Sequence, residues 1–122
     1  IGGGEILIPN VPCDPSVYVS AAVYKDLAGT AFNGIANDSA KMNIIGMVES
    51  KSSPVLCNLR VLGVTPEIFS GLDVTKDYVL SDSIPGAIMT DLVQPGNWIV
   101  PIGQPYSDKK FLVRKGIITK RA

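Results

Sequence analysis

The sequence contains no histidine and only two cysteines among its 122 residues. Histidine is a frequent general base and metal ligand, so its absence excludes a Ser-His-Asp or Cys-His catalytic group built from this chain alone. Cys13 and Cys57 do not have the spacing of a metal site, and we interpret them as small buried hydrophobic residues. The alternative is a disulfide that joins the first segment to the central hairpin, although nothing in the sequence indicates an oxidising compartment.

The sequence also lacks long apolar runs. None approaches the roughly 20 residues that a membrane-spanning helix needs, and the basic region of a signal peptide is missing, so we expect no membrane partner. The chain begins with Ile1-Gly2-Gly3-Gly4, and we interpret residues 1–4 as a linker remnant. A hydrophobic content of 46% with 12 glycines and 9 prolines is typical of a compact, turn-rich β domain, which we place at residues 5–122.

The densest β signal lies at residues 43–64. An apolar run there ends in Ile45-Gly46, a polar turn follows at residues 50–54, and an alternating strand closes on Gly63. This pattern predicts a β-hairpin. Within its second strand, Cys57, Leu59 and Val61 are expected to face inward.

A similar pattern recurs at residues 96–116, where an apolar run again ends in Ile-Gly and a polar turn again leads into an alternating strand. The segments before the two hairpins also match, because residues 23–26 and 79–82 both run into a turn that contains Asp and Gly. We therefore interpret the chain as two pseudo-equivalent halves, at about residues 17–64 and 73–120.

Short strands separated by glycine turns predict an all-β fold, either a small β-barrel or a sandwich. In the first half, Val17, Val19, Ala21 and Val23 alternate with more polar residues, which predicts a strand over residues 17–25 with these four side chains in the core. Further strands are expected at residues 5–8, 31–36, 77–80, 87–89, 98–102, 111–113 and 117–120.

The strongest helical signal lies between the two halves. Thr65 suits an N-cap, Pro66 suits the first helical position, and Gly71 suits the exit from a helix. The signal predicts a single helical turn that inserts Ile68, Phe69 and Leu72 into the core.

The charge is unevenly distributed along the chain. Residues 109–122 hold six basic residues and no acid, whereas residues 1–108 hold five basic and all eleven acidic residues, so the two segments carry +6 and −6. One interpretation is a docking arm for an acidic partner or a nucleic acid. We prefer a final strand with a basic solvent face, because apolar residues interrupt the charges and Phe111 is the sole aromatic residue for base stacking. We therefore expect no nucleic-acid partner.

Several polar patterns were weighed as sites. Ser107 and Lys110 have the Ser-x-x-Lys spacing of some acyl enzymes, but they straddle a predicted turn and do not share a helical face. The acids Asp73, Asp77 and Asp82 lack EF-hand spacing and are explained equally well as turn caps.

Two further patterns suggest binding or modification. Residues 37–39, Asn-Asp-Ser, match a glycosylation sequon, which has meaning only in a secretory-pathway protein. Trp98 and Tyr106 are candidates for a sugar-binding platform, although a core Trp and a half-exposed Tyr are the preferred interpretation. We therefore assign no catalytic, cofactor-binding or metal-binding residue and expect no cofactor and no enzyme activity.

The segments IGMVESKSSPVLCNLRVLGV (45–64), IFSGLDVTKDYVLSDSIPGAI (68–88) and KKFLVRKG (109–116) resemble a module of structural proteins from tailed bacteriophages. The resemblance extends over residues 11–122. It implies a virion protein that is assembled in the bacterial cytoplasm and displayed on the particle exterior, commonly as a homotrimer. It implies no catalytic residues, and it leaves the position on head, tail fibre or receptor-binding tip open.

Two functions from different classes follow from these observations. The first is a non-enzymatic capsid decoration or fibre domain that acts by oligomerisation and by packing on other virion proteins. The second is a module at a tail-fibre end that binds a host surface glycan or receptor through a shallow groove with exposed aromatic residues, such as Trp98 or Tyr106.

Overall fold

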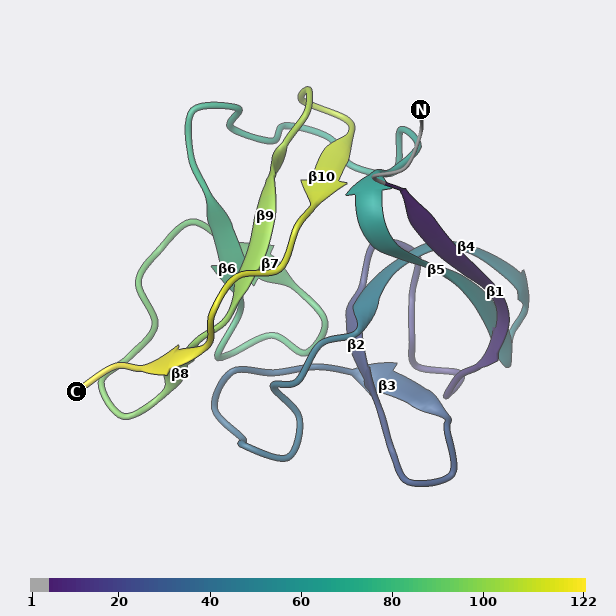
Figure 1. The fold of residues 1–122 in the computed structure, drawn as a ribbon, viewed down its shortest axis with the longest axis horizontal. Coiled ribbons are helices and arrows are strands. Elements are labelled where there is room, and N and C mark those ends of the chain that lie inside the picture. Colours follow the sequence, from purple (N-terminus) through teal and green to yellow (C-terminus); the bar gives the residue numbers. More distant parts are fainter. Residues whose placement is uncertain (1–4) are drawn as a thin grey trace.

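The computed structural model describes residues 5–122 and consists of β-strands and the turns that join them. The predicted linker remnant at residues 1–4 lies outside the described residues. The predicted all-β class is confirmed, and the curled main sheet agrees with a small β-barrel or sandwich (Figure 1). The strands are β1 (Ile6–Pro12), β2 (Ala22–Lys25), β3 (Ala31–Asn33), β4 (Gly46–Ser53), β5 (Leu56–Val64), β6 (Tyr78–Leu80), β7 (Ile88–Met89), β8 (Trp98–Ile99), β9 (Pro101–Pro105), β10 (Phe111–Val113) and β11 (Thr119–Lys120).

The main sheet has the strand order β3-β2-β4-β5-β10-β9-β6-β7, with β1 added to β5. Figure 1 shows β1–β5 on the right and β6–β10 on the left, and the two groups meet where β10 lies beside β5. At this junction Leu112 pairs with Val64 and Val113 pairs with Gly63. Strands β8 and β11 form a separate two-stranded sheet.

The two groups of strands pair in the same order. Strand β2 pairs with β3 and β4, and β4 pairs with β5. Strand β6 likewise pairs with β7 and β9, and β9 pairs with β10. The division into two equivalent halves stays a prediction, and this matching order of strands is the arrangement that such a division requires.

Backbone hydrogen bonds between Gly86, in the turn before β7, and both β2 and the residue after β3 join the two ends of the curled sheet. The backbone N–H of Ala22 donates to the carbonyl oxygen of Gly86 at 2.9 Å, and Gly86 N–H donates to Gly34 at 2.7 Å. A Cβ atom on Gly86 would lie 3.0 Å from the Tyr18 hydroxyl, and the φ of Gly86 is +78°. Glycine therefore suits this junction in both conformation and size.

The core has two layers, one on each side of the sheet formed by β2, β4 and β5. Within β2, Ala22 belongs to the inner layer and Val23 to the outer layer, because successive side chains point to opposite faces. The inner layer contains Ala22, Ala36, Ile44, Met47, Leu80, Val93, Val100, Ile102, Phe111 and Val113. The outer layer contains Val11, Cys13, Val17, Ala21, Val23, Ala31, Val48, Cys57 and Leu59.

The predicted strand over residues 17–25 was too long, because β2 begins at Ala22. Ser20 has a φ of +82°, which breaks the extended conformation, and its N–H donates to the Val48 carbonyl at 2.7 Å. Val19 is exposed instead of facing the core. Ala22 and Val23 are both buried, although they point to opposite faces of the sheet. An alternation of core-facing and solvent-facing residues therefore does not describe this segment.

The predicted helical turn at residues 65–71 was wrong, because this segment is irregular. The backbone N–H groups that a helix would use bond to the β9–β10 turn instead. Phe69 N–H donates to the carbonyl of Lys109 and Leu72 N–H donates to that of Asp108, both at 3.1 Å. Phe69 and Leu72 still pack against the inner core layer, as predicted.

Several predicted strand limits also differ from the structure. Strand β1 continues through Pro9 to Pro12, and β4 extends to Ser53, so the central turn consists of Pro54 and Val55 alone. The predicted strand at residues 98–102 is divided into β8 and β9. The predicted strands at residues 31–36 and 117–120 are shorter, and the latter, β11, pairs with β8.

Candidate functional site

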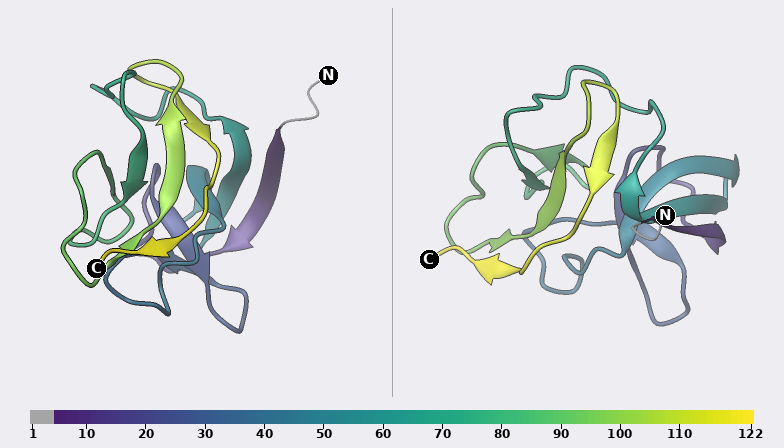
Figure 2. Two further views of the ribbon diagram at one scale, coloured as in Figure 1. Left: turned by 60° about the vertical axis from the view of Figure 1, so that its left-hand side comes forward. Right: turned by 45° about the horizontal axis from the view of Figure 1, so that its top comes forward.

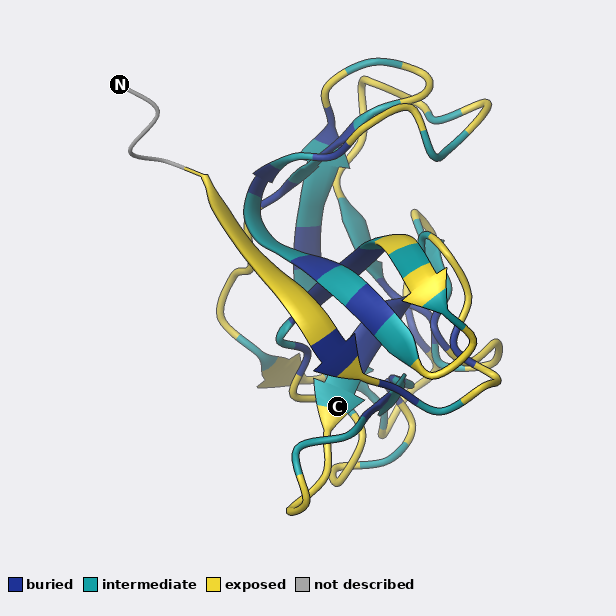
Figure 3. Cartoon of the chain, turned by 90° about the vertical axis from the view of Figure 1, so that its right-hand side faces the viewer, coloured by how far each residue is buried: buried dark blue, intermediate teal, exposed yellow. Residues whose placement is uncertain are grey.

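Strand β1 is the most exposed long strand of the protein. Its residues Ile6, Leu7 and Ile8 are 47%, 44% and 37% exposed, and Figure 3 shows β1 as a largely exposed ribbon beside β5, whose residues are intermediate or buried. Consecutive residues of a strand point to opposite faces, so apolar side chains are available on both faces of β1. Among the described residues, β1 pairs with β5 and with no other strand.

The pairing of β1 with β5 is irregular near its middle. The register shifts between Ile8 and Val11, Asn10 has a φ of +55°, and the Asn10 N–H donates to the side-chain oxygen of Asn58 at 3.0 Å. Pro9 lacks an N–H for a further ladder bond. A second register shift lies between Ile6 and Leu7, so the exposed apolar side chains of Ile6 to Ile8, and not a regular ladder, make this segment suit a contact with another chain. Figure 2 shows β1 at the outer edge of the molecule.

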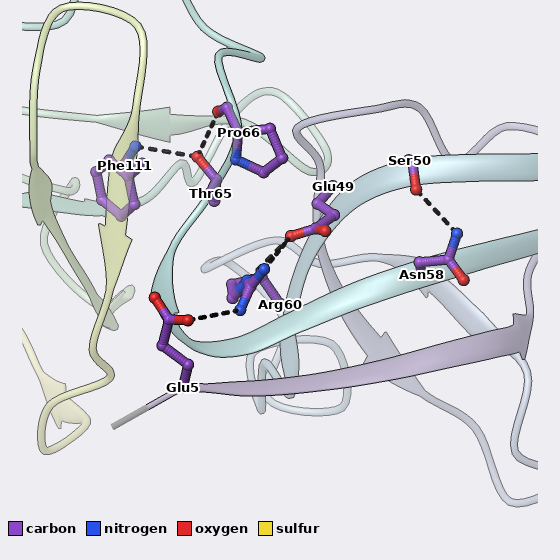
Figure 4. A network of polar contacts seen from close by, with 8 residues as sticks. All are labelled: Glu5, Glu49, Ser50, Asn58, Arg60, Thr65, Pro66 and Phe111. Carbon is purple, nitrogen blue, oxygen red and sulfur yellow. Dashed lines mark hydrogen bonds and ion pairs between the residues drawn. The ribbon is translucent and has the colours of Figure 1, made fainter. Parts of the chain in front are cut away.

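A polar network lies beneath the start of β1 (Figure 4). Two nitrogen atoms of the Arg60 side chain, Nε and Nη2, each lie 2.9 Å from Oε1 of Glu49, and both side chains are largely buried. Nη1 of Arg60 also lies 4.0 Å from the exposed Glu5 carboxylate. The network gives the buried Arg60 a charge partner on β4, and it places a weaker contact at the residue that precedes β1.

A cleft of about 420 Å³ opens beside β6, β9 and the segment that follows β10. Its wall combines the acidic residue Asp77 with the basic residues Arg114 and Lys115. Tyr78 also lines it, and the ring of Tyr78 packs edge-on against the buried Phe111. The Lys115 ammonium also donates to the carbonyl of Ile44 at 2.7 Å. The other lining residues are Val79, Pro101, Gly103 and Gly116. The cleft thus offers hydrogen-bond donors and acceptors around an apolar floor.

The structure agrees with the preferred interpretation of the basic segment, a final strand, and not with a separate docking arm. Asp77 belongs to the acidic segment and Arg114 to the basic one, yet both line the same cleft. Arg121, near the end of the basic segment, donates to the carbonyl of Val93. Residues 111–113 and 119–120 lie in strands, so the separation of charge along the sequence does not correspond to a separate basic arm.

Trp98 and Tyr106 do not form one platform. Trp98 lies on β8, is half-buried against the core, and has the Lys120 ammonium 5.1 Å from its ring centroid. Tyr106 lies at the β9–β10 turn and is 67% exposed. Figure 1 shows β8 at the lower left and this turn at the top, so the two rings are at opposite ends of the β8–β9 segment.

The Ser107 hydroxyl is part of the β9–β10 turn. Its oxygen accepts hydrogen bonds from the backbone N–H groups of Lys109 and Lys110, at 3.2 and 3.1 Å. The spacing that resembled an acyl enzyme therefore coincides with a turn in which Ser107 satisfies backbone donors.

The acidic residues singled out in the sequence do not come together. Asp73 accepts hydrogen bonds from Thr75, which lower the pKa of its carboxyl, and Asp82 accepts from the Gln94 N–H and the Asn97 amide, which lower the pKa of Asp82. Asp77 lines the cleft. Within residues 5–122, no three His, Cys, Asp or Glu side chains are grouped to hold a metal ion.

Asn37 of the sequon is exposed on the loop before β4, and its amide donates to the carbonyl of Asp82 at 3.0 Å.

No family model, curated protein or solved structure matches this chain. Across residues 5–122, no helix has the length and apolar character to cross a membrane.

Sequence reasoning missed both surfaces that are most distinctive in the structure. The apolar run Ile6-Leu7-Ile8 lacks the polar alternation of a strand with one wet face, and that was a signal for an unusual strand. The cleft gave no comparable signal, because Asp77 and Arg114 are far apart in the sequence and neither belongs to a recognisable motif.

Proposed function

We propose that this chain is a non-enzymatic structural module on the exterior of a bacteriophage virion, as a capsid decoration protein or as a head- or tail-fibre domain. It is assembled in the bacterial cytoplasm, forms a homotrimer, and packs on other virion proteins. The resemblance of residues 11–122 to phage structural modules supports the setting. The proposed mode of action depends on β1, which has exposed apolar side chains and pairs with a neighbouring strand along one edge.

Strand β1 suits a contact with another copy for two reasons. Its apolar side chains on both faces would leave water in such a contact, and each fully buried Ile or Leu contributes about 1.5–3 kcal/mol. The outer edge of β1 also offers backbone N–H and C=O groups for pairing with a strand of another chain. An edge of this kind leads to aggregation unless a specific partner covers it. In a closed ring of three copies, each β1 would be covered by a neighbour.

A triple variant of β1 tests this proposal. Ile6→Thr, Leu7→Thr and Ile8→Thr together retain β propensity but remove the apolar surface, so light scattering should show a trimer for the unmodified chain and a monomer for the variant. Leu27→Thr is the matched control, because Leu27 is fully exposed on the β2–β3 turn, away from β1. An unmodified chain that remains monomeric at high concentration contradicts the proposal.

The second candidate function is binding of a host surface glycan or receptor at a tail-fibre end, and the cleft is the observation that favours it. Asp77 and Arg114 provide the acceptor and donor groups that sugar hydroxyls require. A glycan array with the unmodified chain tests this function. Binding that is lost in Arg114→Ala but retained in Arg121→Ala supports it, and an array without binding refutes it.

A further inference from the structure

The two cysteines are buried side by side in the outer core layer. Cys13 is 3% exposed and Cys57 is 0% exposed, and both are free thiols within the same cluster. Cys13 follows the end of β1, whereas Cys57 lies near the start of β5. The two residues are therefore separated by 44 positions in the sequence but lie in neighbouring strands.

The register of the two strands brings the thiols to one face. Val11 pairs with Cys57, and the Cys13 N–H donates to the carbonyl of Val55 at 2.9 Å. Cys57 therefore lies opposite Val11, and Cys13 lies opposite Val55. Side chains two residues apart in a strand share a face, so Cys13 and Cys57 are diagonal neighbours on one face of this antiparallel pair. The two thiols contact each other within one core cluster, but diagonal neighbours have Cα atoms about 7–8 Å apart, so a disulfide between them requires a small shift of the backbone.

The environment of Cys57 also reflects this proximity. Burial, together with the charge of Cys13 and a hydrogen bond with Cys13, raises the pKa of Cys57 to about 12. At neutral pH the Cys57 thiol therefore stays protonated in the closed structure, and a protonated thiol is a poor nucleophile. Both thiols are buried in the outer core layer, so oxidation requires an opening of that layer.

We propose that Cys13 and Cys57 form an oxidisable dithiol whose disulfide locks the end of β1 to β5. A disulfide of low molecular mass, such as oxidised glutathione, is the oxidant. One cysteine thiolate attacks it to form a mixed disulfide and releases one glutathione. The second cysteine thiolate then attacks the mixed disulfide, forms the Cys13–Cys57 bond and releases the second glutathione, and the two thiol protons pass to the two glutathione molecules.

The lock has a consequence for assembly, and that consequence rests on the proposed function. The chain remains a dithiol in the reducing cytoplasm where the particle is assembled, and it becomes a disulfide after release into an oxidising medium. The bond would fix β1, which carries the proposed contact between copies, at the stage when the particle must survive outside the cell.

The test is to refold the full chain from urea in a mixture of oxidised and reduced glutathione. Intact mass spectrometry and peptide mapping then identify the product. We expect a loss of two hydrogen atoms, a cross-link between the peptides that contain Cys13 and Cys57, and a midpoint of thermal unfolding about 10 °C above that of the reduced chain. Cys13→Ser and Cys57→Ser should fold but show neither change.

Two results would overturn the proposal. One is a folded product whose cysteines remain free or carry only glutathione, and the other is a cross-linked product that unfolds at a lower temperature than the dithiol. Light scattering on the reduced and the oxidised chain distinguishes a failure of this disulfide proposal from a failure of the proposed function. A trimer without a disulfide refutes the lock alone, whereas a disulfide in a monomer refutes the trimer alone.

Discussion

The hydroxyl oxygen of Thr65 accepts a hydrogen bond from the backbone N–H of Phe111 at 3.0 Å, and both residues are buried. The backbone bond from Thr65 N–H to the Phe111 carbonyl, at 2.9 Å, lies beside it. The Thr65 hydroxyl also donates to the carbonyl of Pro66 at 2.9 Å. One side chain thus connects the end of β5 to the start of β10, where the two groups of strands meet (Figure 4).

Replacement of Thr65 by valine should destabilise the protein by about 1–3 kcal/mol, because the Phe111 N–H is left buried without a partner. Thr65→Ser keeps the hydroxyl and should lose less. Urea denaturation of each variant measures the free energy of unfolding. Thr119→Val, on the exposed strand β11, is the control and should change stability by less than about 0.5 kcal/mol. Equal effects of the two valine variants would refute this role for Thr65.

The same hydrogen bond explains why the helical signal failed. Thr65, Pro66 and Gly71 are good local signals for the start and end of a helix, and the sequence shows nothing against them. The Thr65 hydroxyl instead bonds to Phe111, which is 46 positions away in the sequence. The Phe69 N–H likewise donates to the carbonyl of Lys109, in the β9–β10 turn. Local propensity is worth a few tenths of a kcal/mol per residue, so buried tertiary hydrogen bonds override it.

The central hairpin was predictable for the opposite reason. Its strands β4 and β5 are adjacent in sequence, and Pro54 marks the turn within one or two residues, so local signals coincide with the tertiary pairing. Strand β2 and the cleft were not predictable in this way. Strand β2 is buried on both faces, because each face packs in a different core layer. The cleft depends on Asp77 and Arg114, which are brought to one place by strands that are not adjacent in the sequence.

The ion pair between Arg60 and Glu49 should be strongly coupled, because both side chains are largely buried and Arg60 contacts the carboxylate through two nitrogen atoms. Arg60→Met leaves the Glu49 charge without its partner and should cost about 3–5 kcal/mol. The double variant with Glu49→Met should recover much of this loss. A thermodynamic cycle on urea denaturation measures the coupling, and additive effects of the two substitutions would contradict it.

Gly46 and Gly103 are at corresponding positions of β4 and β9, and each lies against a carbonyl oxygen of the neighbouring strand. A Cβ on Gly46 would lie 2.6 Å from the Arg60 oxygen, and a Cβ on Gly103 would lie 2.1 Å from the Leu112 oxygen. Alanine at either position forces the backbone of a paired strand to move. We expect each substitution to destabilise the protein by more than about 3 kcal/mol, as judged by thermal unfolding.

Gly71→Ala is the control for these two substitutions. Gly71 has a φ of +70° and open space around its Cβ position, so alanine there costs conformational energy without a clash, about 1 kcal/mol. A Gly103→Ala variant that unfolds at the same temperature as Gly71→Ala would show that the close approach to Leu112 is not a constraint.

The carboxylate of Asp82 stabilises the turn that precedes β8 in a pH-dependent way. It accepts a hydrogen bond from the Gln94 N–H at 2.8 Å and one from the Asn97 amide at 2.9 Å, and these bonds lower its pKa in the folded state. The unfolded chain therefore binds a proton more readily. The contribution is present above the unfolded pKa and is lost as the pH falls through the folded pKa.

Asp82→Ala should consequently destabilise the protein by about 1 kcal/mol at pH 7, a modest value because the side chain is only partly buried. The difference from the unmodified chain should shrink as the pH is lowered below the usual range of an aspartate. Asp91→Ala, at an exposed aspartate, is the control and should leave stability unchanged. Urea denaturation at pH 7 and at pH 3 measures both variants. A deficit for Asp82→Ala that stays constant between these two pH values would show that the alanine removes packing and not a charge-dependent hydrogen bond.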